Sequence, residues 1–101
     1  MIIRGGENIY AAEIEAALFE HPEITDCAVI GVPHDRLGEE VGTVIRVRDG
    51  AELSEADVQT YVGQRLAAFK VPVRVWISDD ELPRNASGKV LKRELRERFV
   101  G

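Results

Sequence analysis

The feature that most restricts the fold of this chain is a continuous apolar run, CAVIGV, at residues 27–32. Successive side chains of a strand point to opposite faces of its sheet, so a strand that is apolar at every position must be covered on both faces. The run ends at Pro33 and is shorter than an ordinary helix. We therefore expect a central strand here, with other elements packed against each side of it.

Shorter apolar patterns predict further strands. Residues 41–47 (VGTVIRV) place apolar side chains at every second position and lead into the turn at Asp49 and Gly50. Residues 73–77 (VRVWI) repeat this alternation after Pro72. The opening residues 1–4 (MIIR) stop at a pair of glycines, which indicates a short strand that enters a loop.

A first helix is predicted at residues 10–19, where the apolar side chains share one face and the glutamates at positions 13 and 15 point away from it. The apolar face consists of Tyr10, Ile14, Ala17 and Leu18. The helix is expected to end at His21, because a residue before proline avoids helical geometry.

Two more helices follow, and together the elements predict the fold class. Ser54 starts the second helix, with Asp57 placed to complete a capping box. The last helix is expected from about residue 90 to 100, with Glu94 and Arg98 as an ion pair. This order predicts an α+β fold in which a small central β-sheet is packed with about three helices, as one domain over residues 1–101.

Composition excludes several classes of function. The formal net charge of −5 argues against a nucleic-acid binder and against attraction to an anionic membrane. No apolar run approaches the length of a membrane span, and the N-terminus lacks the pattern of a signal peptide. The single cysteine, Cys27, excludes an internal disulfide and suits the cytoplasm, and it lies too far from both histidines for a metal site.

One candidate site is the glycine-rich loop at residues 4–10 (RGGENIY). Paired glycines let a backbone approach a ligand closely, and a helix with free N–H donors follows. The spacing matches neither a P-loop nor a dinucleotide-binding fingerprint. On spacing alone, a tight turn from strand to helix, with Glu7 or Asn8 near the cap, is the simpler interpretation.

A second candidate is the polar loop at residues 83–89 (PRNASGK), which presents Lys89 where the last helix is expected to begin. The helix dipole disfavours a cation there, so stability alone does not explain this lysine. A lysine on a loop can neutralise negative charge that develops during acyl or phosphoryl transfer, although most lysines are only solvated surface groups. Phe69 and Lys70 could contact a nucleotide, with a core position as the simpler interpretation for Phe69.

Taken together, these segments resemble the C-terminal domain of the adenylate-forming superfamily, which includes acyl-CoA synthetases, peptide-synthetase adenylation domains and luciferases. The resemblance rests on blocks that occur in the family's order: IIRGGENIY at 2–10 with EIE at 13–15, AVIGVP at 28–33 with GEEV at 38–41, FKVP at 69–72, and LPRNASGKV at 82–90. The GGEN opening resembles fatty-acid and aryl-acid CoA ligases. Ala11, Leu37 and Val71 depart from the commonest residues of the family.

The resemblance implies an acid–thiol ligase that converts a carboxylic acid, ATP and CoA into acyl-CoA, AMP and pyrophosphate. Lys89 would serve adenylation, and the loop at the first glycines would line the CoA tunnel after the domain rotates. The residues at CoA-binding positions are Gly5, Gly6, Glu7, Asn8, Phe69 and Lys70. A large N-terminal domain of the same enzyme would hold the acyl pocket and the Mg²⁺ ligands, so we expect the isolated chain to be inactive.

Three other functions remain open at this level. The chain could be a non-catalytic module that binds a partner or complements a separate N-terminal half. It could belong to a peptide-synthetase-type enzyme, whose product goes to a carrier protein instead of free CoA. It could also be a small phosphate-binding regulatory domain, which would bind nucleotide in isolation.

Overall fold

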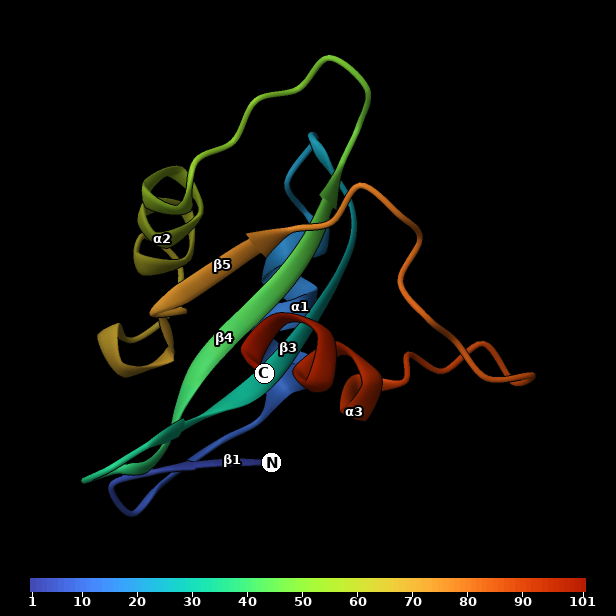
Figure 1. Cartoon of the computed structure of the whole chain (residues 1–101). Coiled ribbons are helices and arrows are strands. Elements are labelled where there is room, and N and C mark those ends of the chain that lie inside the picture. Colours follow the sequence, from blue (N-terminus) through green and yellow to red (C-terminus); the bar gives the residue numbers. More distant parts are fainter.

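The long antiparallel pair of β3 (Ile24–His34) and β4 (Gly38–Val47) forms the middle of the fold. The computed structural model describes all residues, 1–101, and Figure 1 shows helices lying on both sides of the sheet built around this pair. The other elements are β1 (Ile2–Arg4), β2 (Glu7–Ile9), α1 (Ala11–Phe19), α2 (Glu55–Gly63), the 3-10 turn η1 (Ala68–Lys70), β5 (Arg74–Ile77), α3 (Lys92–Leu95) and the π-helical turn η2 (Arg96–Val100).

The sheet has five strands in the order β2-β1-β4-β3, with β5 running parallel to β4. β1 and β2 form an antiparallel hairpin, and this hairpin meets β4 at a single register pair, Arg4 with Gly38. β5 pairs with the middle of β4, from Gly42 to Ile45. β3 is therefore the outer edge strand of the sheet, and its far side has no neighbouring strand.

Two hydrophobic clusters fill the two faces of the sheet. The larger cluster packs the sheet against α1 and α2, and it consists of Ile2, Ile9, Ile14, Leu18, Ile24, Cys27, Val29, Val41, Ile45, Val58 and Val62. The smaller one packs the opposite face against the C-terminal segment, and it consists of Ala28, Ile30, Val44, Leu82 and Leu95. Alternate residues of β3 thus enter different clusters, which confirms the prediction of a strand covered on both faces.

Two buried leucines flank the polar loop in the C-terminal segment. Leu82 and Leu95 are 3% and 0% exposed, and both belong to the smaller cluster, together with Ala28 and Ile30 of β3. Full burial of a leucine side chain is worth about 1.5–3 kcal/mol relative to exposure. The residues between them are therefore tied down at both ends while the loop itself stays at the surface.

The α+β fold and most elements are confirmed, and so is the capping box at α2. The Ser54 side chain accepts the Asp57 N–H at 3.0 Å, and the Asp57 carboxylate accepts the Ser54 N–H at 3.0 Å. These hydrogen bonds hold the pKa of the Asp57 carboxyl below its ordinary value. One strand was not predicted: Glu7–Ile9 forms β2, so the glycines connect two strands and not a strand and a helix.

Four details of the helices differ from the prediction. Tyr10 is exposed and precedes α1, and Glu15 turns toward the sheet, where it accepts the Val29 N–H at 2.9 Å. The last helix begins at Lys92 and not near residue 90. Its ion pair joins Arg93 and Glu97 at 3.7 Å, and not Glu94 and Arg98.

Candidate functional site

Lys89 ends a tight turn that hydrogen bonds within the turn hold together. Arg84 and Val90 form an isolated antiparallel bridge, and the Asn85 N–H donates to the Lys89 carbonyl at 2.9 Å. The Asn85 side chain accepts the N–H groups of Ser87 at 2.9 Å and Lys89 at 3.0 Å. In Figure 1 this segment projects from the body of the domain as an orange loop. The turn thus has a defined shape although it lies at the surface.

The surroundings of Lys89 differ from the prediction in one respect. Helix α3 begins at Lys92, so Lys89 lies before the helix and not at its first turn. The helix dipole weakens within a turn of the terminus, so it gives no reason for or against a cation at this position. The identity of Lys89 is therefore better explained by the charges around it.

Two ion pairs lie beside Lys89. Each joins a cation of the C-terminal segment to a carboxylate on β3 or α1. Arg84 contacts Asp26 of β3 at 2.7 Å, and Lys92 contacts Glu15 of α1 at 3.0 Å. Hydrogen bonding to Asp26 raises the pKa of the Arg84 guanidinium above its ordinary value. The amino group of Lys89 is exposed and makes no ion pair. Of the three cations Arg84, Lys89 and Lys92, only Lys89 is not paired with a carboxylate.

These side chains line an open pocket of about 290 Å³ at the outer edge of β3. Its lining residues are Glu15, Phe19, Cys27, Arg84, Lys89, Val90 and Lys92. Phe19 is 52% exposed, so the pocket has an apolar wall beside its charged rim. Such a mixture suits a ligand that carries both an anionic group and an apolar part.

The glycine turn between β1 and β2 lies at the other end of the sheet, beside the tip of the β3–β4 hairpin. The Gly5 N–H donates to the Leu37 carbonyl at 2.9 Å, and a side chain at Gly5 would meet Leu37 Cδ2 at 2.8 Å. Gly6 has φ +86° and open space around it. Gly5 is therefore needed for close packing, whereas Gly6 leaves the backbone accessible.

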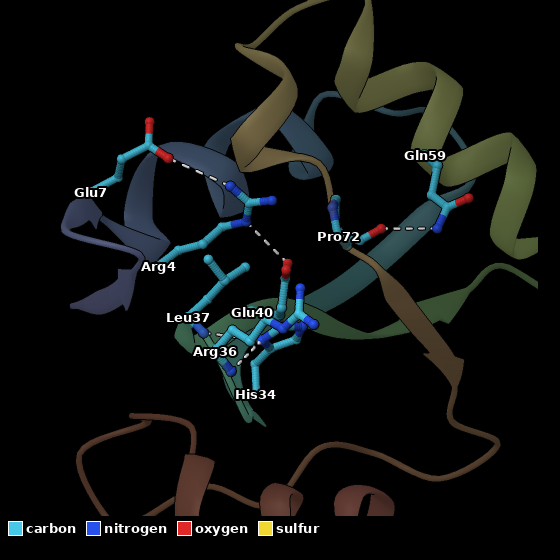
Figure 2. A network of polar contacts seen from close by, with 8 residues as sticks. All are labelled: Arg4, Glu7, His34, Arg36, Leu37, Glu40, Gln59 and Pro72. Atoms are coloured by element: carbon cyan, nitrogen blue, oxygen red, sulfur yellow. Dashed lines mark hydrogen bonds and ion pairs between the residues drawn. The ribbon is translucent and has the colours of Figure 1, made fainter.

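Arg4 fixes this turn through a pair of carboxylates. Figure 2 shows its guanidinium between Glu40, at 3.1 Å, and Glu7, at 3.4 Å. The Glu40 side chain is 11% exposed and that of Glu7 is 45% exposed. Exposed ion pairs contribute about 0.2–1 kcal/mol to folding stability. Of the two pairs, the less exposed one with Glu40 is therefore expected to contribute more. The neighbouring Glu39 adds a contact by accepting the Ile3 N–H at 3.2 Å.

The tip of the β3–β4 hairpin has its own internal brace, also visible in Figure 2. His34 Nδ1 accepts the N–H groups of Arg36 and Leu37, each at 3.1 Å. This brace fixes Leu37, whose carbonyl and side chain contact Gly5. The pair of Arg4 and Glu40 was not predicted from the sequence, because the two residues are far apart in the chain. The local brace by His34 was not predicted either.

The other predicted site residues lie apart from the glycine turn or on its surface. Glu7 and Asn8 are exposed on β2. The Lys70 amino group pairs with Glu13 of α1 at 2.6 Å, and Phe69 is partly buried against the larger cluster. The glycine turn and the Lys89 turn lie on different sides of the domain in Figure 1, so the predicted residues form two surfaces and not one pocket.

Two classes of feature are absent from the domain. No group of three or more His, Cys, Asp or Glu side chains is placed to hold a metal ion. None of its helices combines the length and the apolar composition that crossing a bilayer requires.

Solved structures with this arrangement include a fatty acyl CoA synthetase of Mycobacterium tuberculosis and an o-succinylbenzoate CoA synthetase. ATP-bound MatB from Rhodopseudomonas palustris superposes with a TM-score of 0.88 and 44% identity, over 96% of this chain and 19% of that one. The o-succinylbenzoate CoA synthetase MenE from Bacillus subtilis, in complex with the acyl-adenylate intermediate OSB-AMP, gives a TM-score of 0.86 at 36% identity, over 94% of this chain and 19% of that one.

The family is established by sequence as well. The model of the AMP-binding enzyme C-terminal domain matches residues 13–89, and this chain belongs to that family of acyl-CoA synthetase and CoA ligase domains. The long-chain-fatty-acid–CoA ligase FadD13 of Mycobacterium tuberculosis is 46% identical over 99 residues, which cover 98% of this chain and 19% of that ligase. The chain therefore spans about a fifth of the length of the relatives it matches, and it corresponds to their C-terminal part.

The burial of Cys27 gives a testable property of the pocket wall. The thiol is 3% exposed, and burial, together with the charges of Glu15 and Asp26, raises its pKa from 9.0 to about 12. The thiolate is the reactive form, so at pH 8 the native thiol should react roughly 1000-fold more slowly with a disulfide reagent than the unfolded chain does. Equal rates for the native and the denatured protein would contradict this assignment of Cys27 to packing.

Proposed function

We propose that this chain is the C-terminal domain of an ATP-dependent acid–CoA ligase and that it supplies Lys89 to the adenylation step. The observation that carries the proposal is the charge arrangement at the edge of β3. Arg84 and Lys92 are each paired with a carboxylate, whereas Lys89 is presented on a shaped turn without a partner. An unmatched cation held in this way is suited to an anionic substrate.

The first half-reaction joins the carboxylate of the acid to the α-phosphate of ATP and releases pyrophosphate. A carboxylate is already a nucleophile, so this step needs charge neutralisation and alignment more than it needs a base. The Lys89 ammonium would lie between the two anionic reactants and reduce their repulsion. A lysine is a compact point charge on a flexible stem, which lets it follow the charge as it moves.

The second half-reaction transfers the acyl group from the adenylate to the thiol of CoA. We assign the surface at Gly5 and Gly6 to this step, because its open backbone can lie close to a narrow pantetheine chain. Glu7 and Asn8 would border the same passage. Phe69 and Lys70 would contact the CoA nucleotide, with the Lys70 ammonium shared between Glu13 and a CoA phosphate.

The position of the two surfaces on different sides of the domain supports a rotation between the half-reactions. One face of a small domain cannot present both turns to the same active site at once, so the domain would turn as a rigid body. The remaining parts of the site would come from a large N-terminal domain of the same protein, which would hold the acyl pocket and Mg²⁺. We expect the isolated domain to be inactive and the whole enzyme to be cytoplasmic.

The role of Lys89 is tested with Lys89→Ala in the full-length ligase. Loss of a comparable charge-stabilising donor costs roughly 100- to 1000-fold in rate, and we expect this loss in adenylation alone. Adenylation is followed by pyrophosphate release in a single turnover, and thioester formation is measured separately from supplied acyl-adenylate. Equal losses in the two half-reactions would contradict the division of labour.

The role of the glycine turn is tested with Gly6→Val. A β-branched residue at φ +86° is strained and fills the open space beside the backbone, so thioester formation should fall more than adenylation. Gly50→Val is the matched control, because Gly50 has φ +82° and equally open surroundings in the distant turn after β4. A Gly6→Val enzyme that loses adenylation first, or a Gly50→Val enzyme with the same defect, would refute the assignment.

A further inference from the structure

We propose that Arg84 and Asp26 are positioning residues that hold the Lys89 turn against β3 in the geometry adenylation requires. The proposal rests on the adenylation role proposed for Lys89. Neither residue is assigned to contact a substrate. Their function is to fix the position of the Lys89 backbone relative to β3.

Every nitrogen of the Arg84 guanidinium is occupied within the domain. Nη1 contacts Asp26 Oδ2 at 2.7 Å, and Nη2 donates to Asp26 Oδ1 at 2.8 Å. Nε donates to the Gly88 carbonyl at 3.1 Å, directly before Lys89 in the chain. One planar group therefore joins the strand, the start of the turn and its end. These contacts use three of the five N–H donors of Arg84 and fix the orientation of its guanidinium.

Asp26 is aimed at the turn by the alternation of side chains along β3. The register of β3 against β4 is regular from Asp26 to His34, so Asp26 lies on the same face as Ala28 and Ile30, which the C-terminal segment covers. The register shifts between Ile24 and Asp26, and this irregularity places Ile24 in the larger cluster together with Cys27.

Asp26 is also held in place by its own strand. Its Oδ1 accepts the Cys27 N–H at 2.9 Å, and its side chain is 15% exposed. The carboxylate thus satisfies a backbone donor of β3 and binds Arg84 with both oxygens. A bidentate pair of this kind fixes orientation as well as distance, which distinguishes it from an ordinary surface ion pair.

The brace matters because the turn has few other anchors. Lys89 and its neighbours at 84–88 are exposed, and the buried contacts lie outside the turn at Leu82 and Leu95. The hydrogen bonds of Asn85 set the shape of the turn, but they do not connect it to the sheet. Without Arg84, the turn could keep its shape and still move as a unit relative to β3.

The experiment compares single-turnover rates of both half-reactions in the full-length ligase. A displacement of about 1 Å can slow a reaction by roughly 100-fold, so Arg84→Ala should slow adenylation by up to that factor and leave thioester formation from supplied acyl-adenylate unchanged. Asp26→Asn keeps the shape of the side chain and removes its charge, and it should cause a smaller loss of the same kind. Arg84→Lys should recover part of the rate, since it keeps the charge without the fork.

Two controls separate positioning from loss of stability. Arg48→Ala removes the pair that Arg48 forms with Glu23 at 3.7 Å beside the start of β3, and both rates should stay unchanged. If Arg84 acts through Lys89, the double variant Arg84→Ala/Lys89→Ala should adenylate no more slowly than Lys89→Ala alone. Thioester formation in the same preparation shows that each variant is folded.

The possible outcomes are distinct. A normal adenylation rate in Arg84→Ala, beside a crippled Lys89→Ala, would overturn the positioning role and leave the proposed function intact. The positioning role would also be overturned by equal losses in both half-reactions, or by a further loss in the double variant. A Lys89→Ala enzyme with normal adenylation would remove the proposed function and the positioning role together.

Discussion

The antiparallel pair of β3 and β4 is the element on which the rest of the domain depends, because its side chains are apolar on both faces. Cys27 and Val29 enter one cluster, while Ala28 and Ile30 enter the other. One face requires cover from α1 and α2, and the other requires cover from the C-terminal segment. The segment that covers the second face includes Leu82 and Leu95, and the Lys89 turn lies between these two residues.

The free edge of β3 explains why carboxylates gather beside Lys89. An edge strand exposes backbone N–H groups that need partners. Asp26 accepts the Cys27 N–H, and Glu15 accepts the Val29 N–H. The same two carboxylates pair with Arg84 and Lys92 from the C-terminal segment. The two carboxylates that bind the sheet edge thus also attach the segment that carries Lys89. Because they are paired with Arg84 and Lys92, Lys89 is left without a carboxylate partner in the domain.

The fold was predictable where the local pattern agreed with the packing. The apolar run at residues 27–32 and the capping box at Ser54 and Asp57 each identified an element correctly. The hairpin strand β2 was missed, because its residues Glu7 and Asn8 are polar and only the partner strand β1 holds them extended. Helical periodicity placed Glu15 on the solvent side, since the edge of β3 that it binds is not visible in a local pattern.

The sequence resemblance selected Lys89 and the glycine turn as candidate site residues, but it did not give their arrangement. Gly5 and Gly6 adopt positive φ angles in a tight hairpin. The braces could not be predicted, because Arg84–Asp26 and Arg4–Glu40 each join segments that are distant in the chain.

The proposed contact of the Lys89 amino group with the reacting carboxylate and nucleotide is tested directly by labelling surface amines in the full-length ligase. The rate of modification of each lysine by an amine-selective reagent would be measured by mass spectrometry, with and without a non-reactive acyl-adenylate analogue. We expect the analogue to protect Lys89 strongly, while Lys92, paired with Glu15, keeps its own slower rate. Labelling of Lys89 at the same rate in the free and the bound enzyme would contradict the account.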